Sequence, residues 1–295
     1  MLASRAMKPS ASVWFDIRGL RYHCRTWGDA ATPKLFLLHG WMDVSASFQF
    51  LVDALAGEWY AIAPDWRGYG LTQWSGADSY WFPDYIADLD ALLERFSPDG
   101  PVNLAGHSMG GNVACLYAGI RPARIAKLVN LEGFGMRPTR ADEAPRRYAT
   151  WLDDVAQAQS FRDYASFDEL AARLRKTNSR LTPERALFLA HHWGASTEGG
   201  RVALRSDPAH RRTNPVLYRY EEAAACWRNV AAPVLWVDGA ASETLRYLRV
   251  EEADYAARKA LFSNLVAHTL PDAGHMLHHD QPEALARIVE EFLRS

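Results

Sequence analysis

The segment at 106–110, with the sequence Gly-His-Ser-Met-Gly, constrains the fold of this chain more than any other stretch. It follows an apolar run at 101–105 and precedes a helix-compatible run at 112–118, which gives the order strand, sharp turn, helix. A turn of this kind holds its serine in a strained backbone conformation, with the hydroxyl exposed above a helix N-terminus. Glycines flank the serine because a Cβ there would collide with the neighbouring strand or helix. We therefore expect Ser108 to be an exposed nucleophile.

Short apolar runs alternate with helical patterns along most of the chain. Two segments between the runs, 48–55 and 85–96, have apolar residues three and four positions apart, as amphipathic helices do. This alternation is typical of a mostly parallel sheet with helices on both faces. The first two apolar runs, joined by Gly19, are expected to form a hairpin. The runs of strand length are 13–18, 21–27, 34–38, 59–63, 102–105, 128–131, 233–237 and 266–270.

The alternation stops between 134 and 228, where the patterns are helical only. One helical segment, 182–193, begins with Thr182 in position to cap and Pro183 at the first helical position. The other helical segments are 145–159 and 167–176. We therefore expect a helical unit inserted into a core domain. The expected limits are 12–133 and 229–295 for the core, 134–228 for the insert and 1–11 for an N-terminal tail.

Composition and charge exclude several classes of protein. The formal net charge of −2 gives no reason to expect a nucleic-acid or anionic-membrane partner. No run of eighteen apolar residues occurs, and the N-terminus lacks the apolar stretch of a signal peptide. The three scattered cysteines favour free thiols in a reducing compartment over disulfides or a metal site. We therefore expect a cytoplasmic protein that binds a small-molecule substrate without a cofactor or metal, with its oligomeric state, monomer or homodimer, left open.

A histidine near the end of the chain is the candidate general base. It lies in the segment 272–276, Asp-Ala-Gly-His-Met, directly after the last expected strand. Histidine suits this role because its ordinary pKa lies near neutrality, so that it can take the serine proton and return it to the leaving group. We prefer His275 over its neighbours His278 and His279, which are expected at the entry of the next helix.

The serine turn, the late histidine and a third segment together resemble the α/β-hydrolase family, in its serine-nucleophile branch of serine-hydrolase-like and carboxylesterase-like proteins. The third segment is 39–43, His-Gly-Trp-Met-Asp, which follows the expected strand 34–38. The resemblance covers nearly all residues after the first ten. It implies a mostly parallel eight-stranded sheet flanked by helices, with the insert as a helical cap over the active site. It also implies an oxyanion hole formed by the backbone amides of Trp41 and Met109, with Gly40 allowing close approach.

The acid that would orient the histidine departs from the commonest pattern of the family. That acid usually follows the penultimate strand as Gly-x-x-Asp, but Ser242 stands at this position, and a serine cannot stabilise an imidazolium as a carboxylate does. Glu243 would serve with a shift of one residue. Alternatively, Glu132 ends the apolar strand at 128–131, where an unpaired carboxylate would be costly unless it had a partner such as the histidine. We favour Glu132, with Glu243 and then Asp238 as alternatives.

The segment 64–70, Pro-Asp-Trp-Arg-Gly-Tyr-Gly, also resembles the family, whose loop after this strand carries Asp-x-Arg-Gly-x-Gly. We expect a structural role for it, in which Asp65 and Arg67 pair with each other and the glycines form turns. The segment is therefore left out of the candidate catalytic residues.

These residues predict two-step acyl transfer to water through an acyl-enzyme. The expected enzyme is a carboxylesterase-like hydrolase that cleaves an ester-type bond of a small, apolar acyl substrate, with Trp41 as a candidate wall of the acyl pocket. A thioesterase, lactonase or C–C bond hydrolase is the alternative, since these use the same nucleophilic core. Epoxide hydrolases and haloalkane dehalogenases are disfavoured because they need an aspartate nucleophile. The alternative to an enzyme is a protein of this fold that binds a ligand but does not catalyse a reaction.

Overall fold

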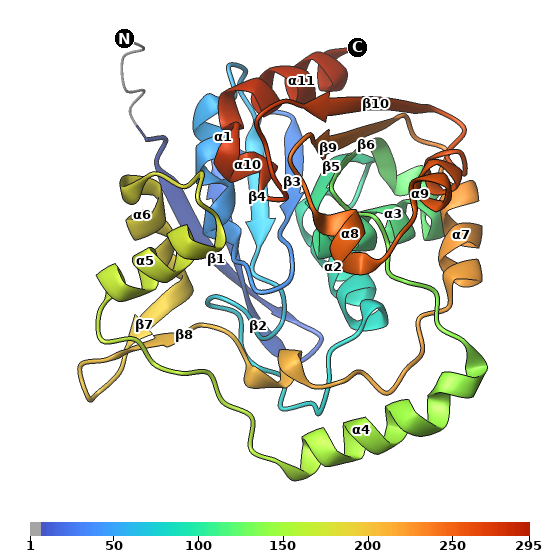
Figure 1. The fold of residues 1–295 in the computed structure, drawn as a ribbon. Coiled ribbons are helices and arrows are strands. Elements are labelled where there is room, and N and C mark those ends of the chain that lie inside the picture. Colours follow the sequence, from blue (N-terminus) through green and yellow to red (C-terminus); the bar gives the residue numbers. More distant parts are fainter. Residues whose placement is uncertain (1–6) are drawn as a thin grey trace.

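The computed structural model describes residues 7–295 as an eight-stranded sheet with helices on both faces and a lobe beside it (Figure 1). The strand order is β1-β2-β4-β3-β5-β6-β9-β10, in which β1 and β4 are antiparallel to β2 and every other pairing is parallel. The predicted fold class is therefore confirmed. The strands are β1 (Ser10–Ile17), β2 (Leu20–Trp27), β3 (Lys34–Leu38), β4 (Tyr60–Pro64), β5 (Val102–His107), β6 (Ile125–Leu131), β9 (Val234–Gly239) and β10 (Leu265–Leu270).

The central strands are apolar throughout because both of their faces are buried. In β3, Phe36 and Leu38 join the core on one face of the sheet, while Leu35 and Leu37 join the core on the other. This division follows from the two-residue repeat of a strand. The first face is covered by α2 (Phe82–Phe96), α3 (Met109–Ile120), α7 (Tyr220–Arg228) and α9 (Glu252–Lys259), and the second by α1 (Gln49–Ala54), α10 (Leu277–Asp280) and α11 (Pro282–Arg294).

The insert contains strands as well as helices, so the prediction of helical patterns only was wrong. A two-stranded antiparallel sheet follows the third of its long helices, and Tyr164 adds a bridge to Val202. Strands of three residues are too short to show a repeat in the sequence, and their pairing depends on contacts within the lobe. The elements of the insert before α7 include α4 (Ala144–Ala156), α5 (Phe167–Thr177), α6 (Pro183–Trp193), β7 (Gly194–Ser196) and β8 (Val202–Leu204).

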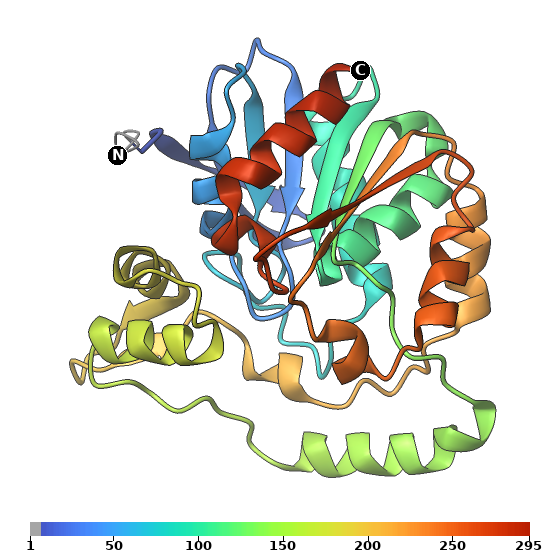
Figure 2. The same cartoon turned by 45° about the horizontal axis from the view of Figure 1, so that its top comes forward.

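The insert divides into parts that contact the core differently. Helices α5 and α6 share a small apolar core, which Phe50 of α1 joins to the main body. This lobe stands beside the sheet, whereas α4 lies at the bottom of both views and buries none of its residues (Figures 1 and 2). Helix α7 instead packs against α3, and its Trp227 belongs to the core of the sheet. The limits 134 and 228 stay predictions.

Several smaller expectations concern the N-terminal segment, the cysteines and the lengths of the helices. Residues 1–6 of the expected tail lie outside the described residues, and β1 begins at Ser10, two residues before the expected start of the core. The three cysteines are free, as predicted. No helix in the described part of the chain is both long and apolar enough to cross a membrane. The cytoplasmic location stays a prediction.

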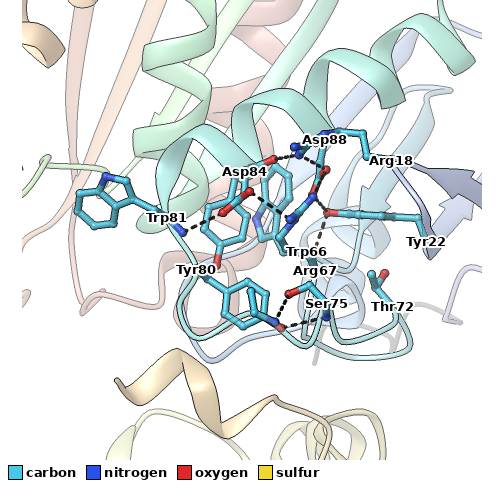
Figure 3. Close-up of polar contacts among 12 residues, drawn as sticks. Arg18, Tyr22, Trp66, Arg67, Thr72, Ser75, Tyr80, Trp81, Asp84 and Asp88 are labelled. Carbon is cyan, nitrogen blue, oxygen red and sulfur yellow. Dashed lines mark hydrogen bonds and ion pairs between the residues drawn. The ribbon is translucent and has the colours of Figure 1, made fainter. Parts of the chain in front are cut away.

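The loop after β4 has a structural role, but the expected pair between Asp65 and Arg67 was wrong. Arg67 reaches α2, where its Nε and Nη2 each lie 2.6 Å from a carboxylate oxygen of Asp88 (Figure 3). Asp65 pairs instead with Nδ1 of His23 at 2.7 Å. The amide of Asp65 donates to the carbonyl of His23, which holds Asp65 beside β2, whereas the guanidinium of Arg67 extends to α2. Both partners are distant in sequence, so local spacing did not reveal them.

Asp65→Asn is expected to lower the free energy of unfolding by about 3 kcal/mol at neutral pH, because an amide replaces a buried carboxylate that accepts hydrogen bonds from His23 and from the backbone amides of Ser45 and Leu71. Burial by itself would raise the pKa of Asp65, but the hydrogen bond and charge of His23 outweigh it and lower that pKa. A lowered folded-state pKa means that the stabilisation is complete above about pH 4 and is lost as the pH falls further. Urea unfolding at several pH values measures this, and the exposed control Asp99→Asn should change stability by less than about 0.5 kcal/mol. Equal effects of the two changes would contradict the prediction.

Candidate active site

The turn after β5 has strained backbone geometry. Ser108 has φ of 51° and ψ of −116°, and it occupies the N-cap position of α3. An ideal Cβ on Gly106 would lie 2.3 Å from the carbonyl oxygen of Gly110, and one on Gly110 would lie 2.2 Å from that of Leu38. Both clashes are with backbone, so neither can be relieved by moving a side chain. The strand, the helix and the neighbouring strand β3 therefore meet around Ser108 with no room for a Cβ at either glycine.

Three side chains from separate strand ends form a continuous chain of polar contacts. The Oγ of Ser108 lies 3.0 Å from Nε2 of His275, and Nδ1 of His275 lies 2.9 Å from Oε2 of Glu132. Because an ionised carboxylate can only accept, Nδ1 carries the proton and Nε2 presents a lone pair to the serine hydroxyl. The side chain of His275 is 32% exposed, whereas that of Glu132 is fully buried. The residues expected as nucleophile, base and acid thus lie together.

The carboxylate of Glu132 is held by two donors besides the histidine. Its Oε1 accepts from the backbone N–H of Gly239 at 2.7 Å, and its Oε2 accepts from the hydroxyl of Ser242 at 2.5 Å. The backbone of Glu132 has φ of 57°, in the left-handed region, directly after β6. Asn130 closes this turn, since its side chain exchanges two hydrogen bonds of 2.9 Å with the backbone of Gly133. The turn and the donors together give the carboxylate a defined position.

The two alternative acids lie elsewhere. The side chain of Glu243 is 82% exposed and pairs with an arginine of α8 (Thr244–Leu248). Asp238, in β9, lies 2.5 Å from Nζ of Lys259 and also accepts from Tyr255. Within residues 7–295, neither carboxylate makes a hydrogen bond or ion pair with His275. Geometry therefore favours Glu132 over both.

Ser242 has a part that the sequence analysis missed. It stands where the family pattern has its usual acid, and its hydroxyl donates to the carboxylate that comes from β6 instead. A carboxylate at position 242 would repel Glu132, whereas the serine hydroxyl donates a hydrogen bond to it. The absence of the usual acid is therefore consistent with a carboxylate supplied from β6. The available signal was a small hydroxyl at this position in a chain that also carries a glutamate at the end of β6.

The loop after β3 passes directly beside Ser108. An ideal Cβ on Gly40 would lie 3.2 Å from the Cβ of Ser108, so a side chain there would crowd that serine. The loop continues to Trp41, whose side chain is 55% exposed, and to Met42, whose φ is 57°. Met109 is the first residue of α3. The amides expected to form the oxyanion hole, those of Trp41 and Met109, thus belong to the two segments that flank Ser108.

His107, directly before the nucleophile, is a second residue that the sequence analysis missed. It is buried, and its Nε2 donates to the backbone carbonyl of His275 at 2.7 Å. Burial lowers the pKa of His107 well below its usual value, and the neighbouring rings of His278 and His275 add to this effect. The neutral ring therefore links the strand that precedes Ser108 to the backbone of His275.

The lobe also contacts the loop that carries His275. Asn178, which follows α5, donates to Oδ1 of Asp280 at 2.7 Å, and Oδ2 of Asp280 accepts from the amide of Gly274 at 2.8 Å. Arg185 of α6 donates to the carbonyl of His279 at 2.7 Å. These contacts tie the position of the lobe to the segment on either side of the base.

Known proteins match this chain along most of its length. The profile of the "Alpha/beta hydrolase family" matches residues 35–288. A serine hydrolase-like protein from Danio rerio is 26% identical, over 95% of this chain and 86% of its own. A 3-hydroxybutyrate-oligomer hydrolase from Cupriavidus necator is 30% identical, over 90% of each chain. The solved thioesterase domain from the curacin biosynthetic pathway shares the fold, with a TM-score of 0.85 and 22% identity over 96% of this chain and 99% of its own.

Gly106→Ala is expected to lower the free energy of unfolding by about 3 kcal/mol, because the added Cβ would overlap the backbone of Gly110. Gly100→Ala is the matched control, since no described atom lies within 4 Å of its ideal Cβ and its φ is not left-handed. That control should leave stability unchanged or raise it by about 0.4–1 kcal/mol. Denaturant unfolding followed by circular dichroism measures both. Equal stability of the two variants would contradict the packing around Ser108.

Proposed function

This chain belongs to the alpha/beta hydrolase family and is an alpha/beta serine hydrolase, and from that premise we propose that it cleaves an ester-type bond of a small, apolar acyl substrate. The observation that carries the proposal is the contact chain from Ser108 through His275 to Glu132, with distances of 3.0 and 2.9 Å. A serine hydroxyl is a weak nucleophile unless a base takes its proton, and the lone pair on His275 is placed to do so.

In the proposed reaction His275 removes the proton of Ser108 as Oγ attacks the carbonyl carbon of the ester. The carbonyl oxygen becomes an oxyanion, which accepts hydrogen bonds from the backbone amides of Trp41 and Met109. The imidazolium then gives its proton to the leaving alcohol, and an acyl-enzyme remains. Water, deprotonated by the same imidazole, attacks the acyl-enzyme and releases the acid, after which the serine regains its proton.

Glu132 is the proposed acid of this mechanism. Its carboxylate stabilises the imidazolium that forms in both steps and holds the ring in the tautomer with Nδ1 protonated. Its burial supports the role, because a charge shielded from water acts more strongly on a neighbouring imidazolium than an exposed one. The hydrogen bonds from Gly239 and Ser242 hold the carboxylate in place, and the carboxylate still accepts the hydrogen bond from Nδ1 of His275.

The nature of the substrate is supported by the surface beside the nucleophile. Trp41 directly follows Gly40, which lies against Ser108, and its indole is exposed, so it is the side chain that we propose contacts an apolar group bound at the serine. The relative from Cupriavidus necator, at 30% identity, is named as a hydrolase of 3-hydroxybutyrate oligomers, which supports ester chemistry. Thioesterase, lactonase and C–C bond hydrolase activities share the same core, and they remain the alternatives that a substrate panel distinguishes.

Three single variants test the assignment of the site. We expect Ser108→Ala to reduce turnover of an activated short-chain ester by roughly 10⁵-fold or more, because the nucleophile is lost. Glu132→Gln should reduce kcat by roughly 10⁴-fold, since an amide cannot stabilise the imidazolium. Glu243→Gln is the matched control and should stay within about twofold of the parent protein, because that side chain is exposed. Steady-state kinetics on folded proteins measures all three.

A fluorophosphonate probe gives a second readout of the same site. The parent protein should be labelled and Ser108→Ala should not, because the probe reacts only with an activated serine. If Glu243→Gln alone lost turnover, the acid would be misassigned. If the parent protein neither reacted with the probe nor hydrolysed any ester, the ligand-binding alternative would hold instead.

Trp41→Ala is expected to lower kcat/KM for butyryl and hexanoyl esters by about tenfold, while acetyl esters change less, because only longer chains reach the indole. The backbone amide of residue 41 is retained in this variant, so the oxyanion hole is unaffected. Trp74→Ala, at another exposed tryptophan, is the control. The panel includes a matched thioester and a lactone for each acyl chain. A consistent preference for either of these over the oxygen ester would replace the proposed substrate class.

A further inference from the structure

A separate group of polar side chains lies buried behind the proposed active site. Asp43, His107 and His278 are each at most 2% exposed, and a carboxylate oxygen or ring nitrogen from each lies within 4.8 Å of those of the other two. Asp43 comes from the loop after β3, His107 ends β5, and His278 lies in α10. The proposed reaction gives this group of three side chains no part in bond making or breaking.

Several polar atoms of the group have no hydrogen-bond partner among residues 7–295. They are Oδ2 of Asp43, Nδ1 of His107 and both ring nitrogens of His278. Oδ2 of Asp43 and Nε2 of His278 are 3.7 Å apart, which is too far for a hydrogen bond. Polar atoms that are buried almost always have partners, because burial removes their hydrogen bonds to water. Unpaired atoms on three adjacent side chains therefore indicate a common partner between them.

The other atoms of Asp43 and His107 are engaged. Oδ1 of Asp43 accepts from the amide of Val44 at 2.8 Å and from Nε1 of Trp193 at 3.1 Å. Nε2 of His107 donates to the carbonyl of His275, which leaves a lone pair on Nδ1. This is how metal ligands are usually oriented, with one atom held by the protein and the other free to coordinate.

His39 provides a contrast within the same region. It is also fully buried, but its Nδ1 donates to the carbonyl of Gly40 at 2.8 Å and its Nε2 accepts from the amide of Trp66 at 2.9 Å. Both nitrogens are satisfied by the protein, so this ring has no free donor atom. Unpaired ring atoms are thus not a property of every buried histidine near the site, although Nε2 of the adjacent His279 also lacks a partner among residues 7–295.

We propose that Asp43, His107 and His278 bind one divalent transition-metal ion of the zinc type. Two imidazole nitrogens and one carboxylate oxygen suit such an ion, whereas Mg²⁺ and Ca²⁺ prefer oxygen ligands alone. Zinc ligands lie about 2.0–2.2 Å from the ion, so two of them can be up to roughly 4 Å apart. The 3.7 Å between Oδ2 of Asp43 and Nε2 of His278 falls within this range, and the ligand atom of His107 lies within 4.8 Å of both. The carboxylate offsets one of the two positive charges.

The ion joins three segments that each carry a part of the proposed active site. The loop with Asp43 also carries Trp41, His107 precedes the nucleophile, and α10 directly follows the segment of the base. An ion at this place therefore acts as a clamp beneath the site and does not touch the substrate. Binding of the ion does not depend on ester hydrolysis, so it is tested by readouts that remain valid if the proposed substrate class is wrong.

Co²⁺ is the probe for this site because its visible absorption reports coordination geometry. The full chain, first stripped with a chelator, should bind one Co²⁺ per chain and show the absorption bands of a site with nitrogen and oxygen ligands. The midpoint temperature of thermal denaturation should rise by roughly 5 °C at saturating Co²⁺, because the ion binds the folded state preferentially. Anomalous scattering from crystals grown with Co²⁺ should locate the ion between the three side chains.

Two variants and one control complete the test. Asp43→Asn and His278→Phe should each abolish the stoichiometric Co²⁺ binding. His278→Phe keeps the ring that stacks on Phe48 and removes two unpaired nitrogens, so without metal it should be at least as stable as the parent protein. The double variant His191→Gln, His192→Gln removes the adjacent histidines of α6, and it should bind Co²⁺ as before. The proposal would be overturned if the parent protein bound no Co²⁺, if His278→Phe still bound it, or if only the double variant lost it. A water molecule found between the three side chains in the crystals, in place of the ion, would also overturn it.

Discussion

The arrangement of the proposed active site depends on the buried carboxylate of Glu132. A charge shielded from water must be compensated by donors that the protein supplies, and this one has three: the amide of Gly239, the hydroxyl of Ser242 and Nδ1 of His275. Gly239 is the last residue of β9, Ser242 follows that strand and His275 follows β10, and these are the next two strands in the sheet after β6. The three strand ends must therefore stay in register with one another, since a shift of any one would leave the carboxylate without a partner.

The parallel sheet brings the remaining parts to the same edge. The carboxyl ends of parallel strands lie together, and here the ends of β3, β5, β6 and β10 carry the Gly40 loop, Ser108, Glu132 and His275. Positive φ values at Ser108 and Glu132 mark the two points where the backbone turns sharply to present a side chain at this edge. Buried His107, the last residue of β5, then donates a hydrogen bond to the backbone of His275 and so connects two of these strand ends.

The patterns with a strong local repeat were the ones that could be predicted. Each of the eight main strands was expected within a few residues of its position. The central strands read as continuous apolar runs because both of their faces are buried, whereas the edge strands β1 and β10 are largely exposed. The short strands β7 and β8 were missed, since three residues carry no repeat. The predicted partner of Asp65 was wrong for a related reason. Its observed partner, His23, lies 42 residues away, and only the pairing of β2 with β4 brings the two together.

The sequence by itself determined the type of chemistry and the candidates for it. The glycines around Ser108, a histidine after the last strand and a glutamate at the end of an apolar strand are local features, and each restricts what its own segment can do. Only the tertiary structure decided which carboxylate faces His275, that Ser242 supports that carboxylate, and that Asp43, His107 and His278 share one buried space. These depend on distances between segments that lie far apart in the chain, and such distances are set by strand order and packing rather than by local sequence.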